Sequence, residues 1–182
     1  MRKKKSPKAL KGYIQIYTGN GKGKTTAALG LALRAAGHEY RTFIGQFLKG
    51  QDYGELAAVK KLEPYITIRQ FGRKGFVHVN KNPDKIDIDL AKKGLEECRQ
   101  AMLSGDYNII ILDELTVCLY FNLLVEQEII EFLRQKPPEI EIIITGRYAP
   151  DSLIAAADLV TRMDEIKHYY TKGIPARNGI EK

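Results

Sequence analysis

The chain has 182 residues, which is the size of one compact domain with its own core. Hydrophobic residues make up 44% of it and charged residues 28%, and these shares exclude a fibrous, collagen-like or wholly disordered protein. No apolar run approaches the roughly 18 residues of a membrane helix, and no apolar stretch follows the basic start. We therefore expect no membrane contact and a cytoplasmic location.

The net charge of +7 is concentrated at the N-terminus. Residues 1–11 hold six of the 29 basic residues and no acidic one, which leaves 23 bases against 22 acids in the rest of the chain. We predict a flexible basic tail over residues 1–11 and a single domain over residues 12–182. The tail is either a solvated terminus or a loose phosphate or partner contact, and the nearly neutral remainder argues against nucleic-acid binding.

Short β-branched and aromatic runs alternate with longer segments of helical period, a pattern typical of βα units and a parallel sheet. In chain order we expect a strand at residues 13–18, a helix at 24–36, a strand at 41–47, a helix at 54–61, a strand at 66–70, a long loop at 71–85, a helix at 86–104, a strand at 108–112, a helix at 126–135, a strand at 140–145, a helix at 150–157 and a strand at 159–163. Long loops in compact domains are often functional.

A glycine-rich segment joins the first expected strand to the first helix. Its sequence matches the phosphate-loop pattern GxxxxGK[ST] at Gly23, Lys24 and Thr25, with Thr18 in place of the first glycine. Such a loop directs backbone N–H groups at phosphate oxygens, while its lysine contacts the outer phosphates and its hydroxyl completes a magnesium shell. An ordinary glycine-rich turn is the alternative. The strand–loop–helix context favours a phosphate site, and with it a P-loop NTPase-like (RecA-like) α/β fold with helices on both faces of a mostly parallel sheet.

An acidic pair, Asp113 and Glu114, ends the apolar run NIIIL. The carboxyl ends of parallel strands meet at one edge of a sheet, so both carboxylates should face the phosphate loop and bind Mg²⁺ directly or through water. Asp113 could instead be a helix N-cap. Glu114 has two interpretations, a base for a hydrolytic water or a magnesium ligand only, and with Lys24 it is our candidate catalytic residue.

The two cysteines, Cys98 and Cys118, have no CxxC or Cys/His spacing. This arrangement indicates neither a disulfide framework nor a zinc site. We predict that both are buried thiols.

Several segments together resemble the ATP:corrinoid adenosyltransferases of vitamin B12 synthesis and salvage, the cob(I)yrinic acid a,c-diamide adenosyltransferases. They run in order from about Gly12 to Glu181 and comprise GYIQIYTGNGKGKTTAALGLALRAAGH, QFLKG, Gly75-Phe76, IIILDEL, IIITGR and ADLVTRMDEIKHYYTKGIPARNGIE. The resemblance implies that the 5′-deoxyadenosyl group of ATP moves to the cobalt of a reduced corrinoid, and that triphosphate leaves. It also implies an ATP held with its γ-phosphate where other P-loop enzymes hold the α-phosphate, a homodimer, and a reductase that supplies electrons to cobalt.

The same resemblance assigns roles to residues. The triphosphate is held by the glycine-rich loop, at Gly19, Asn20, Gly21, Lys22, Gly23, Lys24, Thr25 and Thr26. Thr25 and Glu114 are implied magnesium contacts. Phe76 matches an aromatic position that faces the corrin, and His78 stands where better-known relatives carry tryptophan. His78 either stacks near the corrin or binds its cobalt.

Other polar residues lie beside expected strand ends. Gln46, Lys49 and Arg147 either contact nucleotide or corrinoid or are surface and packing residues, and we include Arg147 among the ligand-binding residues. His168, near the end of the chain, is expected to pack on a partner.

Two other functions fit parts of the sequence. A P-loop ATPase would hydrolyse ATP to drive a partner, and its products would be ADP and phosphate. A RecA-like nucleic-acid-binding protein would use the basic tail, and its binding would weaken steeply with salt.

Overall fold

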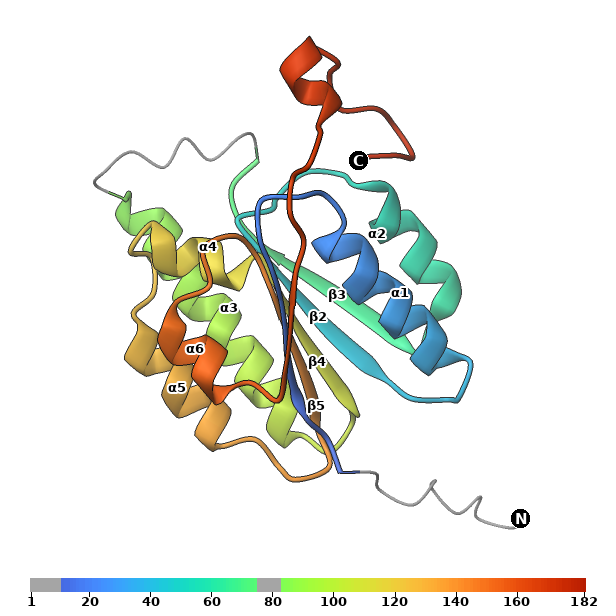
Figure 1. The fold of residues 1–182 in the computed structure, drawn as a ribbon. Helices are drawn as coiled ribbons and strands as arrows, with labels where there is room; N and C mark the ends of the chain where they lie inside the picture. Colours follow the sequence, from blue (N-terminus) through green and yellow to red (C-terminus); the bar gives the residue numbers. More distant parts are fainter. Residues whose placement is uncertain (1–10, 75–82) are drawn as a thin grey trace.

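A computed structural model describes residues 11–74 and 83–182, which form a sheet with helices on both faces (Figure 1). All strand pairs are parallel, and the strand order is β3-β2-β4-β5-β1-β6. The strands are β1 (Ile14–Thr18), β2 (Thr42–Phe47), β3 (Ile66–Phe71), β4 (Ile109–Asp113), β5 (Glu141–Thr145) and β6 (Leu159–Arg162). The expected α/β fold is confirmed. The first ten residues of the expected tail, Phe76 and His78 lie outside the described residues.

The helices divide between the two faces: α1 and α2 lie on one face, and α3, α4, α5 and α6 lie on the other (Figure 1). Their bounds are α1 (Lys24–Ala36), α2 (Gly54–Val59), α3 (Lys85–Leu103), α4 (Leu115–Tyr120), α5 (Glu126–Arg134) and α6 (Asp151–Ala156), with 3₁₀ turns at Lys60–Leu62 and Tyr169–Lys172. Every predicted strand and helix is present, with ends that differ from the prediction by at most two residues.

The core lies on both faces of the central strands. Ile110, Leu112 and Ile142 pack under α3, α4, α5 and α6, while Ile111 and Ile143 pack under α1 and α2. Burial of one such side chain stabilises the fold by about 1.5–3 kcal/mol. The central strands are therefore apolar on both sides, as parallel strands covered by two helical layers must be.

One close approach depends on a glycine. A Cβ on Gly94 of α3 would lie only 2.7 Å from the ring of Phe71, and 2.9 Å from the ring of Phe47. Any larger residue at this position would push α3 away from β2 and β3.

The segment after β4 differs from the prediction. Residues 115–120 form α4, although β-branched and aromatic residues fill half of this segment and have low helix propensity. The suggestion that Asp113 is a helix N-cap is wrong. Asp113 pairs with Gln46 of β2 as the last residue of β4, and the residue before the helix is Glu114, with a left-handed φ of 63°. The helix therefore begins without the usual capping signal.

Cys98 and Cys118 are both free and completely buried, so the predicted buried thiols are confirmed. Burial raises the pKa of both thiols. Among residues 11–74 and 83–182, no helix has the length and apolar character needed to cross a membrane.

Candidate active site

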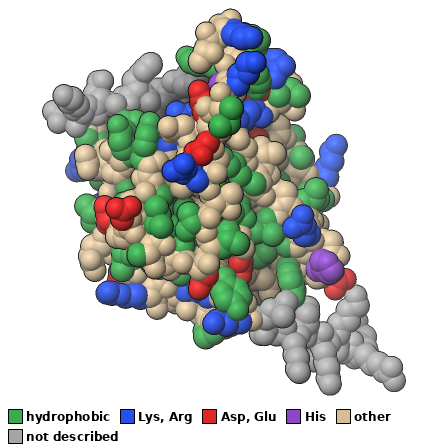
Figure 2. Space-filling model, in the orientation of Figure 1, with side chains coloured by type: hydrophobic (Ala, Val, Ile, Leu, Met, Phe, Trp, Pro, Cys, Tyr) green, Lys and Arg blue, Asp and Glu red, His purple; other side chains and the backbone are tan. Residues whose placement is uncertain are grey.

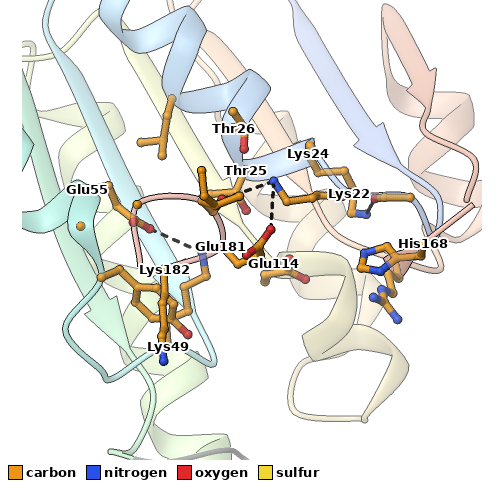
Figure 3. Close-up of a pocket in the computed structure, with 18 of the residues that line it drawn as sticks. Lys22, Lys24, Thr25, Thr26, Lys49, Glu55, Glu114, His168, Glu181 and Lys182 are labelled. Atoms are coloured by element: carbon orange, nitrogen blue, oxygen red, sulfur yellow. Dashed lines mark hydrogen bonds and ion pairs between the residues drawn. The ribbon is translucent and has the colours of Figure 1, made fainter. Parts of the chain in front are cut away.

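A cavity of about 500 Å³ opens at the carboxyl edge of the sheet. Figure 3 shows side chains from the β1–α1 loop, from the segment after β2, from the end of β4 and from the end of the chain converging on it. Nine of the predicted site residues line it: Asn20, Gly21, Lys22, Gly23, Lys24, Thr25, Thr26, Glu114 and Arg147. This edge is where open α/β sheets bind ligands.

The β1–α1 loop holds its lysine in place. Gly19 and Gly23 adopt φ angles of 96° and 119°, which favour glycine, and a Cβ on Gly19 would lie 2.4 Å from the carbonyl oxygen of Met163. The Lys24 ammonium donates hydrogen bonds of 2.7 Å to the carbonyl oxygens of both Gly19 and Gly21. An ammonium group has three donors, so one remains for an anion in the cavity.

The charge of Lys24 is costly in this position. Its side chain is only 6% exposed, and burial lowers its pKa, while the nearby Glu114 carboxylate acts in the opposite direction. An anionic ligand in the loop would lessen this cost, because it favours the charged form of the lysine.

The Asp113 carboxylate is buried under the loop and saturated with hydrogen bonds. Its Oδ1 accepts from Thr25 Oγ1 at 2.8 Å and Thr145 Oγ1 at 2.7 Å, and its Oδ2 accepts from Lys49 Nζ at 2.8 Å and Gln46 Nε2 at 3.4 Å. A carboxylate has about four acceptor positions, and all four are used. Asp113 therefore joins α1, β2 and β5 around the site and has no free position for a direct metal bond.

Lys49 is paired with acids on two sides. Burial is the largest single influence and would lower the pKa of Lys49, but the charge and hydrogen bond of Asp113, together with the charges of the nearby glutamates, raise it overall. Lys49 also lies 3.9 Å from Glu55 of α2. Gln46 lies behind this group, where it donates to Glu55 at 3.0 Å. Lys49 thus faces the cavity, while Gln46 supports the network beneath it.

Of the acidic pair after β4, Glu114 is the residue that reaches the cavity. Its left-handed backbone follows the end of β4, and its N–H donates to Thr145 Oγ1 at 3.0 Å. Burial, followed by the charge of Asp113, raises the pKa of Glu114, and the cationic neighbours Lys49 and Lys24 only partly oppose this. Within the described part of the chain its carboxylate has no hydrogen-bond partner.

A magnesium ion fits these oxygens. No group of three or more His, Cys, Asp and Glu side chains within residues 11–74 and 83–182 is arranged to hold a metal by itself. Mg²⁺, however, usually keeps several waters and binds one or two protein oxygens together with substrate phosphates. The Thr25 hydroxyl and the unpartnered Glu114 carboxylate are such oxygens, and Asp113 would act through Thr25 or a water.

Several residues of the cavity wall were not predicted from the sequence. They are Tyr53, Gly54 and Glu55 at the start of α2 and Gly179, Ile180, Glu181 and Lys182 at the end of the chain. His168, expected to pack on a partner, lies in this wall as well. None of these belongs to a local motif for nucleotide binding, so only the folded chain brings them to the site.

Comparison with known proteins gives the same family as the motifs. Residues 10–181 match the family described as ATP:corrinoid adenosyltransferase BtuR/CobO/CobP. The corrinoid adenosyltransferases of Sinorhizobium sp. and Escherichia coli K12 are each 33% identical to this chain, over 94% of it and over 80% and 86% of their own lengths.

A solved structure supports the fold. The flagellar accessory protein FlaH from Methanocaldococcus jannaschii matches with a TM-score of 0.58 and 16% identity, over 84% of this chain and 71% of its own. At this identity the likeness shows the P-loop ATPase-like α/β fold alone. The family match and the relatives go further: the chain belongs to the ATP:corrinoid adenosyltransferases, a family of transferases that adenosylate corrinoids.

Proposed function

We propose that the protein transfers the 5′-deoxyadenosyl group of ATP to the cobalt of a reduced, cob(I)alamin-type corrinoid. The electron pair of cobalt forms the bond to C5′, the C5′–O bond breaks, and its electrons leave with triphosphate. Reduced cobalt is a strong nucleophile, so no protein base is required. The protein must align the two substrates and stabilise the charge on the leaving group.

The position of the Lys24 ammonium is the observation that supports this proposal most strongly. Its ammonium is fixed by two loop carbonyls, is buried, and keeps one donor for an anion, and these features support binding of a triphosphate without further rearrangement. Preorganised charge of this kind is effective because the protein does not reorganise during the reaction. Lys22 and Arg147 add positive charge to the same cavity.

Glu114 and Thr25 would hold Mg²⁺ against the triphosphate. When bound there, the ion would neutralise negative charge on the phosphates and on the departing oxygen. We propose that Asp113 does not contact the ion itself but positions the Thr25 hydroxyl, which donates a hydrogen bond to its carboxylate.

The family resemblance also implies how ATP is oriented. We propose that its γ-phosphate takes the place in the loop that other P-loop enzymes give to the α-phosphate, an orientation that would leave C5′ open to the corrinoid. Phe76 and His78 are the residues proposed to face the corrin. We further propose cob(I)yrinic acid a,c-diamide as a substrate, and a cytoplasmic homodimer that receives electrons from a reductase and binds no nucleic acid.

ATP hydrolysis is the second candidate. It is favoured by Glu114, whose raised pKa and free carboxylate would suit a base for a hydrolytic water. The two candidates differ in their products, because hydrolysis gives ADP and phosphate whereas adenosyl transfer gives triphosphate.

Product analysis separates them. The protein is incubated anaerobically with ATP, magnesium and chemically reduced cobalamin, with a parallel sample that lacks the corrinoid. We expect a light-sensitive cobalt–carbon product and an equal amount of triphosphate, both dependent on corrinoid. ADP and phosphate in both samples would support the ATPase instead, and no turnover of ATP in either would contradict both.

A further inference from the structure

The end of the chain folds back over the nucleotide cavity. After β6 the chain rises beyond the carboxyl edge of the sheet, then returns toward the β1–α1 loop and α2 (Figure 1). Figure 2 shows basic side chains gathered on this upper part of the molecule. We call residues 177–182 the C-terminal strap. Four of its residues line the cavity. The backbone oxygen of Lys182 lies 3.8 Å from the position that a Cβ atom would take on Gly54 of α2.

Glu181 holds the strap in its folded shape. Its Oε1 accepts from the Tyr169 hydroxyl and, at 3.2 Å, from Arg177 Nη2, and its Oε2 accepts from the N–H and the Nε of Arg177 at 2.9 and 3.3 Å. The guanidinium also lies 4.9 Å from the centre of the Tyr169 ring. These bonds lower the pKa of Glu181 to about 2, so it is ionised at neutral pH.

This carboxylate has no acceptor position left for a ligand. Four donors occupy the roughly four positions that a carboxylate offers. Glu181 is consequently unable to bind a ribose hydroxyl unless the strap unfolds. Its place in the structure is that of a positioning residue.

Lys22 connects the strap to the phosphate loop. Its ammonium donates to the carbonyl oxygen of Ile180 at 3.3 Å and lies 4.0 Å from Glu181 Oε1 (Figure 3). A side chain of the loop that is proposed to hold triphosphate is thus bonded to the last residues of the chain.

The strap covers the cavity without filling it. With the strap in place about 500 Å³ remains, which is within the usual 300–1,000 Å³ of a small-molecule site. The inner wall beneath it carries Lys24 and Glu114. A ligand on the loop would therefore lie between the inner wall and the strap.

We propose that the C-terminal strap is the outer wall of the nucleotide site, positioned by Glu181 and Lys22, and that it retains ATP on the phosphate loop. This inference rests on the proposed function for the identity of the nucleotide. Removal of a preformed wall leaves the ligand with fewer contacts and a freer route of escape, so the expected loss is in affinity and not in chemistry.

The first test measures ATP binding by calorimetry, with magnesium and without corrinoid. Glu181→Gln keeps the size of the side chain, removes its charge and replaces an acceptor by a donor that faces Arg177. We expect the Kd for ATP to rise about tenfold, and in the full reaction the KM for ATP to rise similarly while kcat changes less than about twofold. Glu165→Gln, the same change at an exposed position of the C-terminal segment, should alter neither value.

A second variant and a second readout guard against misfolding. Deletion of residues 178–182 should weaken ATP binding at least as much as Glu181→Gln, with an unchanged circular dichroism spectrum. In the wild-type chain, ATP with magnesium should slow tryptic cleavage after Arg177 about tenfold, followed as release of the last five residues by mass spectrometry.

The outcomes are distinguishable. If the wild-type chain binds no ATP, both the strap proposal and the proposed function fail. If it binds ATP and forms the adenosylated product, but the variants bind ATP unchanged and cleavage after Arg177 is not slowed, only the strap proposal is wrong. Tighter binding after the deletion would also overturn it, since the strap would then be a plug.

Discussion

The two walls of the cavity are held by different forces. The inner wall, formed by the β1–α1 loop and Glu114, is attached to β1 and β4, which pair with the buried strand β5 from its two sides. The outer wall is the C-terminal strap, in a segment where Ile166 is 91% and Tyr170 75% exposed. A few hydrogen bonds hold it instead of a core. Changes to the inner wall should therefore affect chemistry and stability, and changes to the outer wall should affect ligand retention.

Lys24→Ala gives the largest expected effect on the inner wall. It removes the preorganised charge from the leaving group, so the rate of adenosyl transfer should fall about 10²–10³-fold, with a higher KM for ATP. Lys93→Ala, an exposed lysine on α3, is the matched control and should leave the rate unchanged. Rates are measured from the appearance of the light-sensitive product. A loss below tenfold would mean that the inner wall does not stabilise the leaving triphosphate.

The phosphate loop and the sheet were predictable because their signals are local. The loop residues are contiguous. The two acidic residues directly follow the apolar run NIIIL, at the end of a strand, where parallel topology directs them toward the loop. The acidic pair alone made both Asp113 and Glu114 candidate magnesium ligands, and only the family resemblance favoured Glu114. The structure gives a physical reason for that choice: Asp113 stays in β4 and is saturated with hydrogen bonds, while the left-handed turn at Glu114 brings its carboxylate to the cavity.

The outer wall was not predictable for a physical reason. Lys22 and Ile180 are 158 positions apart, and their contact depends on the path of the chain after β6. That path is not fixed by an apolar pattern, because β6 and the segment after it are largely exposed. Polar contacts between distant exposed residues leave no periodicity in the sequence.

Glu114→Gln tests the second charged group of the inner wall. We expect transfer to fall about 10–100-fold, because the amide oxygen is a weaker, uncharged ligand for magnesium, and the fall should be strongest at low magnesium concentration. Rates measured against magnesium concentration check this. If the fall in rate is the same at every magnesium concentration, Glu114 is not a metal ligand.

The same variant has a pH signature in stability. The folded-state pKa of Glu114 is raised above its ordinary 4.5, so its contribution to stability is complete below that value and is lost as the pH rises through the raised pKa. The side chain in Glu114→Gln does not ionise, so the variant does not lose stability in this way as the pH rises. At pH 8 without ligands its Tm should exceed that of the wild type by about 2–4 °C. Thermal unfolding of both proteins from pH 4 to pH 8 checks the sign. Parallel curves would contradict the shift.

Two helical glycines test the packing that supports the inner wall. In Gly94→Ala the new methyl group would meet the Phe71 ring at 2.7 Å, and we expect about 1–3 kcal/mol of destabilisation. Gly30→Ala is the matched control, because no atom lies within 4 Å of its Cβ position in α1. It should stabilise the fold by up to about 1 kcal/mol through helix propensity. Urea unfolding gives both values, and equal effects would show that α3 is not closely packed on β3.

The smallest expected effect is an absence of reaction. Cys98 of α3 and Cys118 of α4 lie in the core between the sheet and helices α3 to α6, both fully buried, and burial raises their pKa so that little thiolate forms. Thiol titration of the native protein should therefore detect neither cysteine, and titration in denaturant should detect both. Under the same native conditions trypsin should still cut after Arg177 in the strap when ATP is absent. If the thiols react as fast as trypsin cleaves the strap, the core and the outer wall open together, and the proposed difference in rigidity between the two walls is wrong.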